Sequence, residues 1–331
     1  MTMVITRTPY RLSFFGGGTD YPVHYREHGG CVLHTTINKY CHIICRDLPP
    51  FFEHKHLVRY SRTECPNSID QIEHPSVREC MRKYGVETGL EVNHSGDIPA
   101  MSGVGSSSSF TVGLVHALAA MRGELRTKRE LALEAIHIEQ DMIGENVGSQ
   151  DQVAAAFGGL NFVEFDAKNE FKVKMVTAPR ETITTLQDNL LIFYTGISRF
   201  ASTIAEEQIA NAKKNANDLF TMRDMAYEAL HILHQGPDHV DDFGRLLHES
   251  WRLKRGLGTK VSNQAIDDMY EAARRAGALG GKLCGAGGGG FLMVYVPPQA
   301  QPAVREALKD LLYIPFTFES LGSHIAFFSH A

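Results

Sequence analysis

Three absences narrow what this chain of 331 residues can be. It contains no run of 18 apolar residues, and its first residues, MTMVITRTPYRLSFF, lack the apolar core of a signal peptide, so we expect no membrane partner. Its 33 Lys and Arg are fewer than its 38 Asp and Glu and are scattered along the chain, which argues against a nucleic-acid-binding protein with a basic face. The composition favours a cytoplasmic enzyme and leaves a homo-oligomer open.

Cysteine and histidine motifs are missing as well. The six cysteines show no CxxC spacing and mostly lie in apolar or strand-like stretches, where a buried, reduced thiol is the ordinary role. His54 and His56 flank a lysine, but no HExxH or Cys/His set accompanies them. We therefore expect reduced thiols and no transition-metal site.

Short runs rich in Val, Ile, Thr and aromatic residues dominate the first half and predict strands. The predicted strands cover residues 4–15, 31–37, 41–47, 56–61, 90–95 and 160–165. Helical patterns fall at residues 76–85, 110–121 and 128–144. The second of these is apolar nearly all round, which predicts a buried helix.

The pattern of predicted elements changes after Pro179, from mostly strands to mostly helices. The predicted elements there are a buried strand (190–194), three or four helices (about 202–276), a glycine-rich turn into a strand (280–296), a helix (303–312) and a strand (323–329). Together with the first half they predict an α+β protein of two lobes, residues 1–185 and 186–331.

The stretch DIPAMSGVGSSSSFTVG, residues 97–113, stands between a predicted strand and a predicted helix. A helix start has unpaired N–H groups and a partial positive charge, and Gly103 and Gly105 let the backbone approach a ligand closely. The serines can cap the helix, bind phosphate oxygens or offer a hydroxyl to Mg²⁺. The stretch is neither a Walker A loop nor a GxGxxG loop, and a simple serine-capped helix is the alternative.

Two further stretches place charged side chains in unusual surroundings. TPYRLSFFGGGTDYP, residues 8–22, puts Arg11 in an otherwise apolar strand, where it needs an anionic partner if buried. ENVGSQDQVAAAFGGL, residues 145–160, puts Asp151 at the start of an alanine-rich helix, and Glu139 lies in the helix before it. A hairpin turn and a capping aspartate are the simpler alternatives.

A fourth stretch, KLCGAGGGGFLMV at residues 282–294, has five glycines in six positions. That is too many for one β-turn and suggests a stretch of backbone that lies directly against a ligand.

In order and spacing, the four stretches are similar to those of the GHMP family of small-molecule kinases, which includes galactokinase, homoserine kinase, mevalonate kinase and phosphomevalonate kinase. Galactokinase-like proteins have a Pro-x-Arg strand followed by Thr-Asp-Tyr, a Pro-x-x-x-Gly-Leu-Gly-Ser-Ser loop, a Gly-x-x-Asp-Gln stretch and a late glycine-rich loop. The corresponding residues here are Pro9, Arg11, 19–21, Pro99, 103–107, 148–152 and 285–290.

The resemblance implies a two-lobed GHMP kinase fold, with an N-terminal lobe like ribosomal protein S5 domain 2 and a ferredoxin-like C-terminal lobe. It implies ATP and Mg²⁺ as cofactors and a small-molecule sugar phosphate as substrate. Asp151 and Arg11 would be catalytic, and Ser107 and Glu139 would hold the metal. The ATP-binding residues would be Ser102, Gly103, Val104, Gly105, Ser106, Ser107 and Ser108. The substrate-binding residues would be Gly17, Gly18, Thr19, Asp20, Arg199, Gly287 and Gly288.

One departure from the galactokinase pattern bears on the substrate. Galactokinases have Gly-Glu-His before Thr-Asp-Tyr, whereas this chain has three glycines at 16–18; losing those two side chains weakens a galactose assignment. RLSFFGGGTDYP, TGISRFAS and GGKLCGAGGGGF instead resemble the D-glycero-D-manno-heptose 7-phosphate kinases, which phosphorylate the anomeric hydroxyl on the way to a nucleotide-activated heptose. Arg199, Lys254 and Arg255 are available to bind the phosphate, although each is equally compatible with a solvated charge.

Two alternatives stay open. An anomeric kinase for another sugar, such as fucose, would also lack the Glu-His pair and would need no basic residues for a substrate phosphate. A catalytically silent sugar-sensing protein on the same scaffold is the other, but Arg11, Glu139 and Asp151 are all present and give no reason to favour it.

Overall fold

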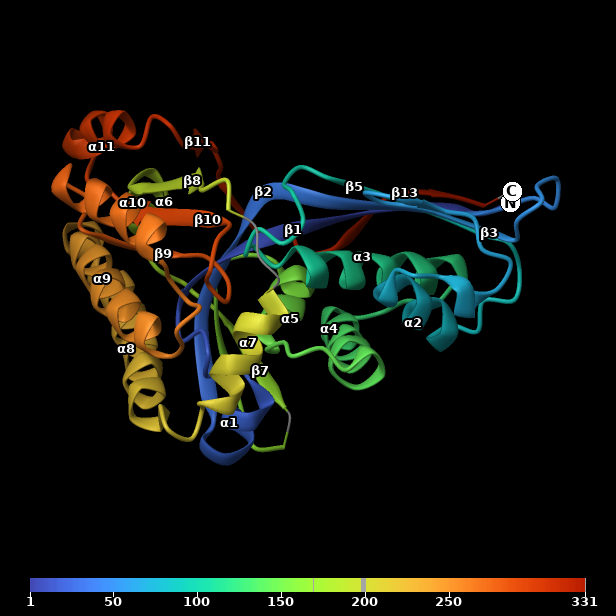
Figure 1. The fold of residues 1–331 in the computed structure, drawn as a ribbon, viewed down its shortest axis with the longest axis horizontal. Coiled ribbons are helices and arrows are strands. Elements are labelled where there is room, and N and C mark those ends of the chain that lie inside the picture. The colour runs from blue at the N-terminus through green and yellow to red at the C-terminus, as the bar shows by residue number, and fades with distance from the viewer. Residues whose placement is uncertain (169, 198–200, 331) are drawn as a thin grey trace.

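Two β-sheets with helices packed against them form the molecule, and the computed structural model describes residues 1–168, 170–197 and 201–330 (Figure 1). The larger sheet has nine strands in the order β13-β1-β2-β5-β3-β4, with β6 and β12 also pairing with β2, and β7 with β6. Its strands are β1 (Met3–Phe15), β2 (Gly30–Asp47), β3 (His56–Arg59), β4 (Thr63–Glu64), β5 (Leu90–Gly96), β6 (Asn161–Phe165), β7 (Phe171–Met175), β12 (Phe318–Glu319) and β13 (His324–Ser329). The smaller sheet, in the order β11-β8-β10-β9, consists of β8 (Leu190–Tyr194), β9 (Gly280–Leu283), β10 (Phe291–Tyr295) and β11 (Leu312–Tyr313).

Helices lie against both sheets. Those of the first half are α1 (Pro22–His28), α2 (Pro75–Lys83), α3 (Ser106–Met121), α4 (Lys128–His137) and α5 (Gln150–Phe157). Those of the second half are α6 (Arg180–Asp188), α7 (Ala201–Ala210), α8 (Ala216–Gln235), α9 (Val240–Gly256), α10 (Gln264–Arg275) and α11 (Gln301–Ala307). Single turns stand at η1 (Ile69–Gln71), η2 (Ile138–Ile143), η3 (Pro237–His239) and η4 (Pro298–Ala300). No described helix is both long and apolar enough to cross a lipid bilayer.

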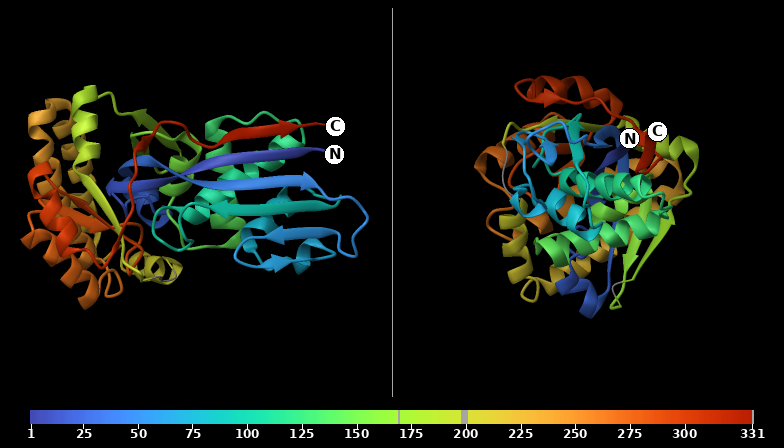
Figure 2. Two further views of the ribbon diagram at one scale, coloured as in Figure 1. Left: turned by 90° about the horizontal axis from the view of Figure 1, so that it is seen from above. Right: turned by 90° about the vertical axis from the view of Figure 1, so that its right-hand side faces the viewer.

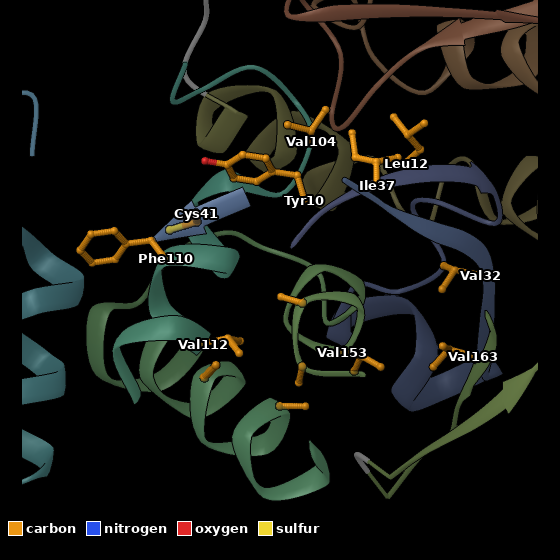
Figure 3. Close-up of a cluster of buried hydrophobic side chains, with 14 of the residues drawn as sticks. Tyr10, Leu12, Val32, Ile37, Cys41, Val104, Phe110, Val112, Val153 and Val163 are labelled. Carbon is orange, nitrogen blue, oxygen red and sulfur yellow. The ribbon is translucent and has the colours of Figure 1, made fainter. Parts of the chain in front are cut away.

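Helix α3 is buried between the large sheet and the helices α2, α4 and α5 (Figure 1). Its nearly all-apolar sequence accounts for this position, because a helix without a polar face is stable only when it is covered on all sides. Figure 3 shows side chains of β1, β2 and α3, among them Leu12, Ile37 and Val112, within the same cluster. The helix begins four residues before the predicted start, at Ser106, because Gly105 takes a left-handed conformation (φ 75°) and ends the loop there. The serines therefore form its first turn.

Strand β2 is one strand of 18 residues, where the sequence predicts two strands separated at residues 38–40. The pairing of β1 with β2 shifts register between Pro9 and Tyr10, whose partners are Tyr40 and Ile37. This bulge accommodates the polar residues that look like a turn in the sequence, so the strand continues through them.

The helix predicted at 128–144 is α-helical only to His137 and continues as a π-helical turn, η2. Wider turns of this kind are frequent at functional sites. Here the turn carries Glu139, one of the two predicted metal ligands.

The end of the chain returns to the large sheet. Strand β13 pairs with β1 in antiparallel fashion, and the two termini lie side by side at one end of the molecule (Figure 2). The strands of the smaller sheet all come from residues 190–313. The division of the chain at residue 185 stays a prediction, to which the structure adds that residues 318–329 pair with the strands of the first half.

Candidate active site

A buried arginine paired with a partly exposed aspartate lines a cavity to which both halves of the chain contribute. Arg11, which is 5% exposed, donates from Nε and Nη2 to the two carboxylate oxygens of Asp151, each over 2.8 Å. Burial alone would lower the pKa of Arg11, but the charge of Asp151 raises it, so the guanidinium stays charged. The anionic partner that the sequence requires for Arg11 is therefore Asp151.

The glycine-serine loop forms a second wall of this cavity. Gly103 accepts a hydrogen bond of 2.6 Å from Nη1 of Arg11 through its carbonyl oxygen, and Gly105 lies so close that an added Cβ would be 3.4 Å from Oδ2 of Asp151. Both glycines have positive φ, 80° and 75°. The N-terminus of α3, with Ser106, Ser107 and Ser108 in the lining, thus faces the carboxylate. Ser102 and Val104 of the predicted loop are buried and do not line the cavity.

Glu139 is fully buried behind the first turn of α3. Its Oε2 accepts a 2.9 Å hydrogen bond from the hydroxyl of Ser108 and one from the amide of Gln152, whereas its Oε1 has no hydrogen-bond partner. Burial raises the pKa of Glu139 to about 7. The structure brings Glu139 into contact with Ser108 and not with Ser107, the serine that the sequence pairs with it.

Asp20 is a second buried carboxylate in the lining of the cavity, 7% exposed. It accepts from the backbone N–H of Gly18 over 2.9 Å, and an added Cβ on Gly148 would lie 2.0 Å from its Oδ2. Burial raises its pKa. Gly17 and Gly18 also line the cavity. Thr19 does not, because its hydroxyl bonds the carbonyl oxygens of Gly16 and Cys31.

The glycine-rich turn between β9 and β10 closes the cavity from the smaller sheet. Gly285 and Ala286 line it, and Gly285 is in backbone contact with Gly103. Gly287 and Gly288, the two glycines that the sequence assigns to the substrate, pack against Val261 instead. A run of glycines indicates that other groups approach the backbone closely. It does not indicate which glycine faces the ligand.

The predicted basic residues have different placements. Arg199 lies outside the described residues. Lys254 lines the cavity and is 4% exposed, whereas Arg255 pairs with Asp267 of α10 outside it.

A second cavity, which the sequence did not reveal, adjoins the first across the loop. The two share Met101, Ser106 and Ser107 in their linings. The second is rich in aromatic rings, with Tyr10, Tyr60, His74, His94 and Phe110 in its wall. His74 stacks on Phe110 at 4.6 Å between ring centroids, with 21° between the planes. These residues come from β1, the end of β3, the residue before α2, β5 and α3, so only the folded chain groups them.

The cavity thus combines a carboxylate held by an arginine with a helix N-terminus, which suits phosphoryl transfer. Residues 73–159 match the sequence pattern of the GHMP kinases N terminal domain, and residues 230–314 match that of the GHMP kinases C terminal. The chain belongs to the GHMP kinase family. It is therefore a phosphotransferase, as the resemblance predicts.

Individual GHMP kinases match almost the whole chain. It is 30% identical to the D-glycero-alpha-D-manno-heptose 7-phosphate kinase of Campylobacter jejuni, over 97% of this chain and 98% of that one. It is 27% identical to the L-fucokinase/L-fucose-1-P guanylyltransferase of Bacteroides fragilis, over 92% of this chain and 36% of that protein.

Solved structures share the fold of this kinase. The crystal structure of a D-glycero-D-manno-heptose 1-phosphate kinase from Bacteroides thetaiotaomicron superposes with a TM-score of 0.78 at 24% identity, covering 98% of both chains. The galactokinase of Lactococcus lactis superposes with a TM-score of 0.74 at 20% identity, covering 97% of this chain and 95% of that one. The predicted two-lobed GHMP kinase fold is confirmed.

Proposed function

We propose that the protein is an ATP-dependent sugar kinase that transfers the γ-phosphoryl group to the anomeric hydroxyl of D-glycero-D-manno-heptose 7-phosphate and forms the 1,7-bisphosphate. The observation that carries the phosphoryl-transfer assignment is the bidentate Arg11–Asp151 pair facing the N-terminus of α3. The choice of sugar is supported by the full-length similarity to a heptose 7-phosphate kinase.

The proposed reaction needs one proton acceptor. Asp151 accepts the proton of the anomeric hydroxyl while the sugar O1–phosphorus bond forms and the bond from γ-phosphorus to the β,γ-bridging oxygen breaks, which releases ADP. Arg11 holds both carboxylate oxygens, so Asp151 is fixed in orientation, and each oxygen keeps a lone pair for the incoming proton. Asp20 accepts hydrogen bonds from further sugar hydroxyls.

The nucleotide would occupy both cavities. The aromatic cavity around His74 and Phe110 suits the flat base, which binds by stacking. The phosphates would then cross Ser106 and Ser107 to reach Asp151, with the backbone of the loop and the N-terminus of α3 as their donors.

The side chains near α3 fit a magnesium ion. Glu139 Oε1 is buried without a partner, and no group of three or more His, Cys, Asp or Glu suited to a metal occurs within 1–168, 170–197 and 201–330. A cation held by one carboxylate, one hydroxyl and nucleotide phosphates is the arrangement Mg²⁺ favours. We propose Glu139 and Ser107 as its ligands. When bound, Mg²⁺ neutralises charge on the phosphates.

Turnover of ATP against a panel of sugars tests the substrate. We expect the highest kcat/KM for heptose 7-phosphate, and a product with two phosphorus resonances, because the acceptor keeps its own phosphate. Fucose belongs in the panel on account of the fucokinase relative. A higher kcat/KM for fucose would refute the heptose assignment, and no turnover of any sugar would refute the sugar kinase assignment.

Ser107→Ala should raise the Mg²⁺ concentration needed for half-maximal activity by about tenfold or more, since loss of a group that holds or orients a metal has effects of this size. The matched control is Ser109→Ala, because the Ser109 hydroxyl is buried and donates to the carbonyl of Pro9. Titration of kcat with Mg²⁺ measures both variants. If the Mg²⁺ requirement rises in Ser108→Ala and not in Ser107→Ala, the metal ligand is Ser108, the serine that contacts Glu139.

A further inference from the structure

Lys254 is a buried cation at a position where the sequence pattern calls for an apolar residue. The buried face of α9 repeats at three- and four-residue intervals through Phe243, Leu247 and Trp251, and Lys254 is the next member of this series. The lysine is 4% exposed. Burying an ammonium group in a protein is costly unless it is paired with an anion.

No such anion contacts Lys254 in the described part of the chain. Its Nζ donates to the carbonyl oxygen of Gly285, and no carboxylate among the described residues lies within ion-pair distance. An ammonium has three donors, so hydrogen-bonding capacity remains. Lys282, which is also buried, donates to the carbonyl of Phe14 but does not line the cavity.

The ammonium of Lys254 lies on the cavity that holds the reacting groups. Arg11, Asp20 and Asp151 line the same cavity. Gly285, whose carbonyl accepts from Lys254, lies against Gly103 of the glycine-serine loop. Asp151 is already bound at both carboxylate oxygens by Nε and Nη2 of Arg11. The charge of Lys254 is therefore available for a ligand.

We propose that Lys254 is a phosphate-binding cation of the active site, whose ammonium binds a phosphate oxygen when both substrates are present. The proposal rests on the proposed kinase function. The oxygen can come from the transferred phosphoryl group of ATP or from the phosphate of the acceptor sugar, and these two sources are distinguished by experiment.

Ionisation of Lys254 gives the proposal a pH dependence. Burial, and then the charge of Arg11, lower the pKa of Lys254 from 10.5 to about 8. The titratable groups around it are Arg11 on β1, Asp20 after β1, Asp151 on α5, Lys282 on β9 and the Cys284 thiol. Because the charged form binds phosphate, kcat/KM should fall as the pH rises through about 8.

Protein stability should change in the opposite direction. A lysine whose pKa is lower in the folded than in the unfolded state makes the folded state more stable as the pH rises from about 8 to 10.5. The charge on Lys254 at neutral pH thus lowers the stability of the fold while it promotes binding of phosphate. If the lysine served only packing, kcat/KM would not fall over the pH range in which stability rises.

The test compares Lys254→Met, Lys254→Arg and the control Arg252→Met. Arg252 lies on the same helix with a 60% exposed side chain. We expect Lys254→Met to lower kcat/KM by about 10²-fold, as loss of one electrostatic contact in an active site does. It should also lose the decline above pH 8 and melt at a higher temperature than wild type at pH 7. Lys254→Arg should recover part of the activity, and Arg252→Met should keep all of it.

Two acceptors identify the source of the oxygen. A loss confined to heptose 7-phosphate assigns Lys254 to the acceptor phosphate, and an equal loss with unphosphorylated heptose assigns it to the phosphoryl group of ATP. If wild type prefers another sugar, the heptose assignment fails and the same variants are compared on that sugar. The Lys254 proposal is wrong if Lys254→Met keeps kcat/KM within twofold of wild type. It is also wrong if the variant melts at a lower temperature and still shows the decline above pH 8.

Discussion

Replacing Asp151 with asparagine should reduce kcat by at least 10²-fold and leave binding of ATP largely intact. Asparagine has nearly the same shape as aspartate but cannot accept the proton of a sugar hydroxyl, and general base catalysis contributes 10² to 10⁴ in rate. ATP would contact the loop and α3, neither of which changes. A steady-state assay with the best sugar of the panel, together with a calorimetric titration with ATP, separates these two effects.

Asp141→Asn is the matched control for this variant. It makes the same chemical change on the preceding turn η2, where Asp141 pairs with His137 and its side chain is 64% exposed. Removing the charge of Asp151 also leaves the guanidinium of Arg11 buried with a neutral partner, which destabilises the fold. The melting temperature of each variant must therefore be measured before kcat is compared. If folded Asp151→Asn retains a kcat within tenfold of wild type, Asp151 is not the base.

The parts of the site that the sequence predicts are those whose residues stand in short, recognisable stretches, even where the stretches are far apart in the chain. Arg11 in an apolar strand needs an anion, and its partner Asp151 lies in one of the four recognisable stretches. Contacts across helical turns are harder to infer. Ser107 and Ser108 are adjacent in sequence, and only the packing of α3 against η2 decides which hydroxyl contacts Glu139.

The formation of the aromatic cavity and the position of Lys254 on the active-site cavity both depend on packing between residues far apart in the chain. His74 and Phe110 are each ordinary in their local sequence, and they stack only because α2 lies against α3. For Lys254 a signal did exist, because the apolar face of α9 continues onto it. A charged residue at the core-facing position of an amphipathic helix indicates a polar partner or a bound ligand, because a lysine is rarely buried unless it is paired.

The fold, too, was predicted where the local sequence carries the signal and missed where long-range pairing decides the structure. Strand and helix types were predicted correctly where apolar residues dominate a stretch, as in β1, β8 and α3. The continuity of β2 was missed because a bulge in its pairing with β1 accommodates residues 38–40. The pairing of β13 with β1 spans nearly the whole chain, and no local pattern encodes such a distant partner.

Gly103→Ala should lower kcat/KM by about 10²-fold or more and should also reduce stability. Gly103 has a φ of 80°, and an added Cβ would lie 2.5 Å from the carbonyl oxygen of Cys284. Both contacting groups are backbone, so neither can move without shifting the glycine-serine loop or the glycine-rich turn at Gly285. The Gly103 carbonyl also accepts a hydrogen bond from Arg11. A shift of the loop would thus disturb the catalytic pair, and displacements near 1 Å cost about 10²-fold in rate.

Gly123→Ala separates the steric contact from backbone strain. Gly123 has a φ of 71°, but an added Cβ there meets nothing within 4 Å. Both variants carry the cost of a left-handed alanine, about 1–2 kcal/mol, and only Gly103→Ala adds the collision. We therefore expect Gly123→Ala to lower the melting temperature slightly and to leave kcat/KM unchanged. Equal losses of stability in the two variants, with activity retained in both, would mean that the contact between the two glycine loops does not hold the site together.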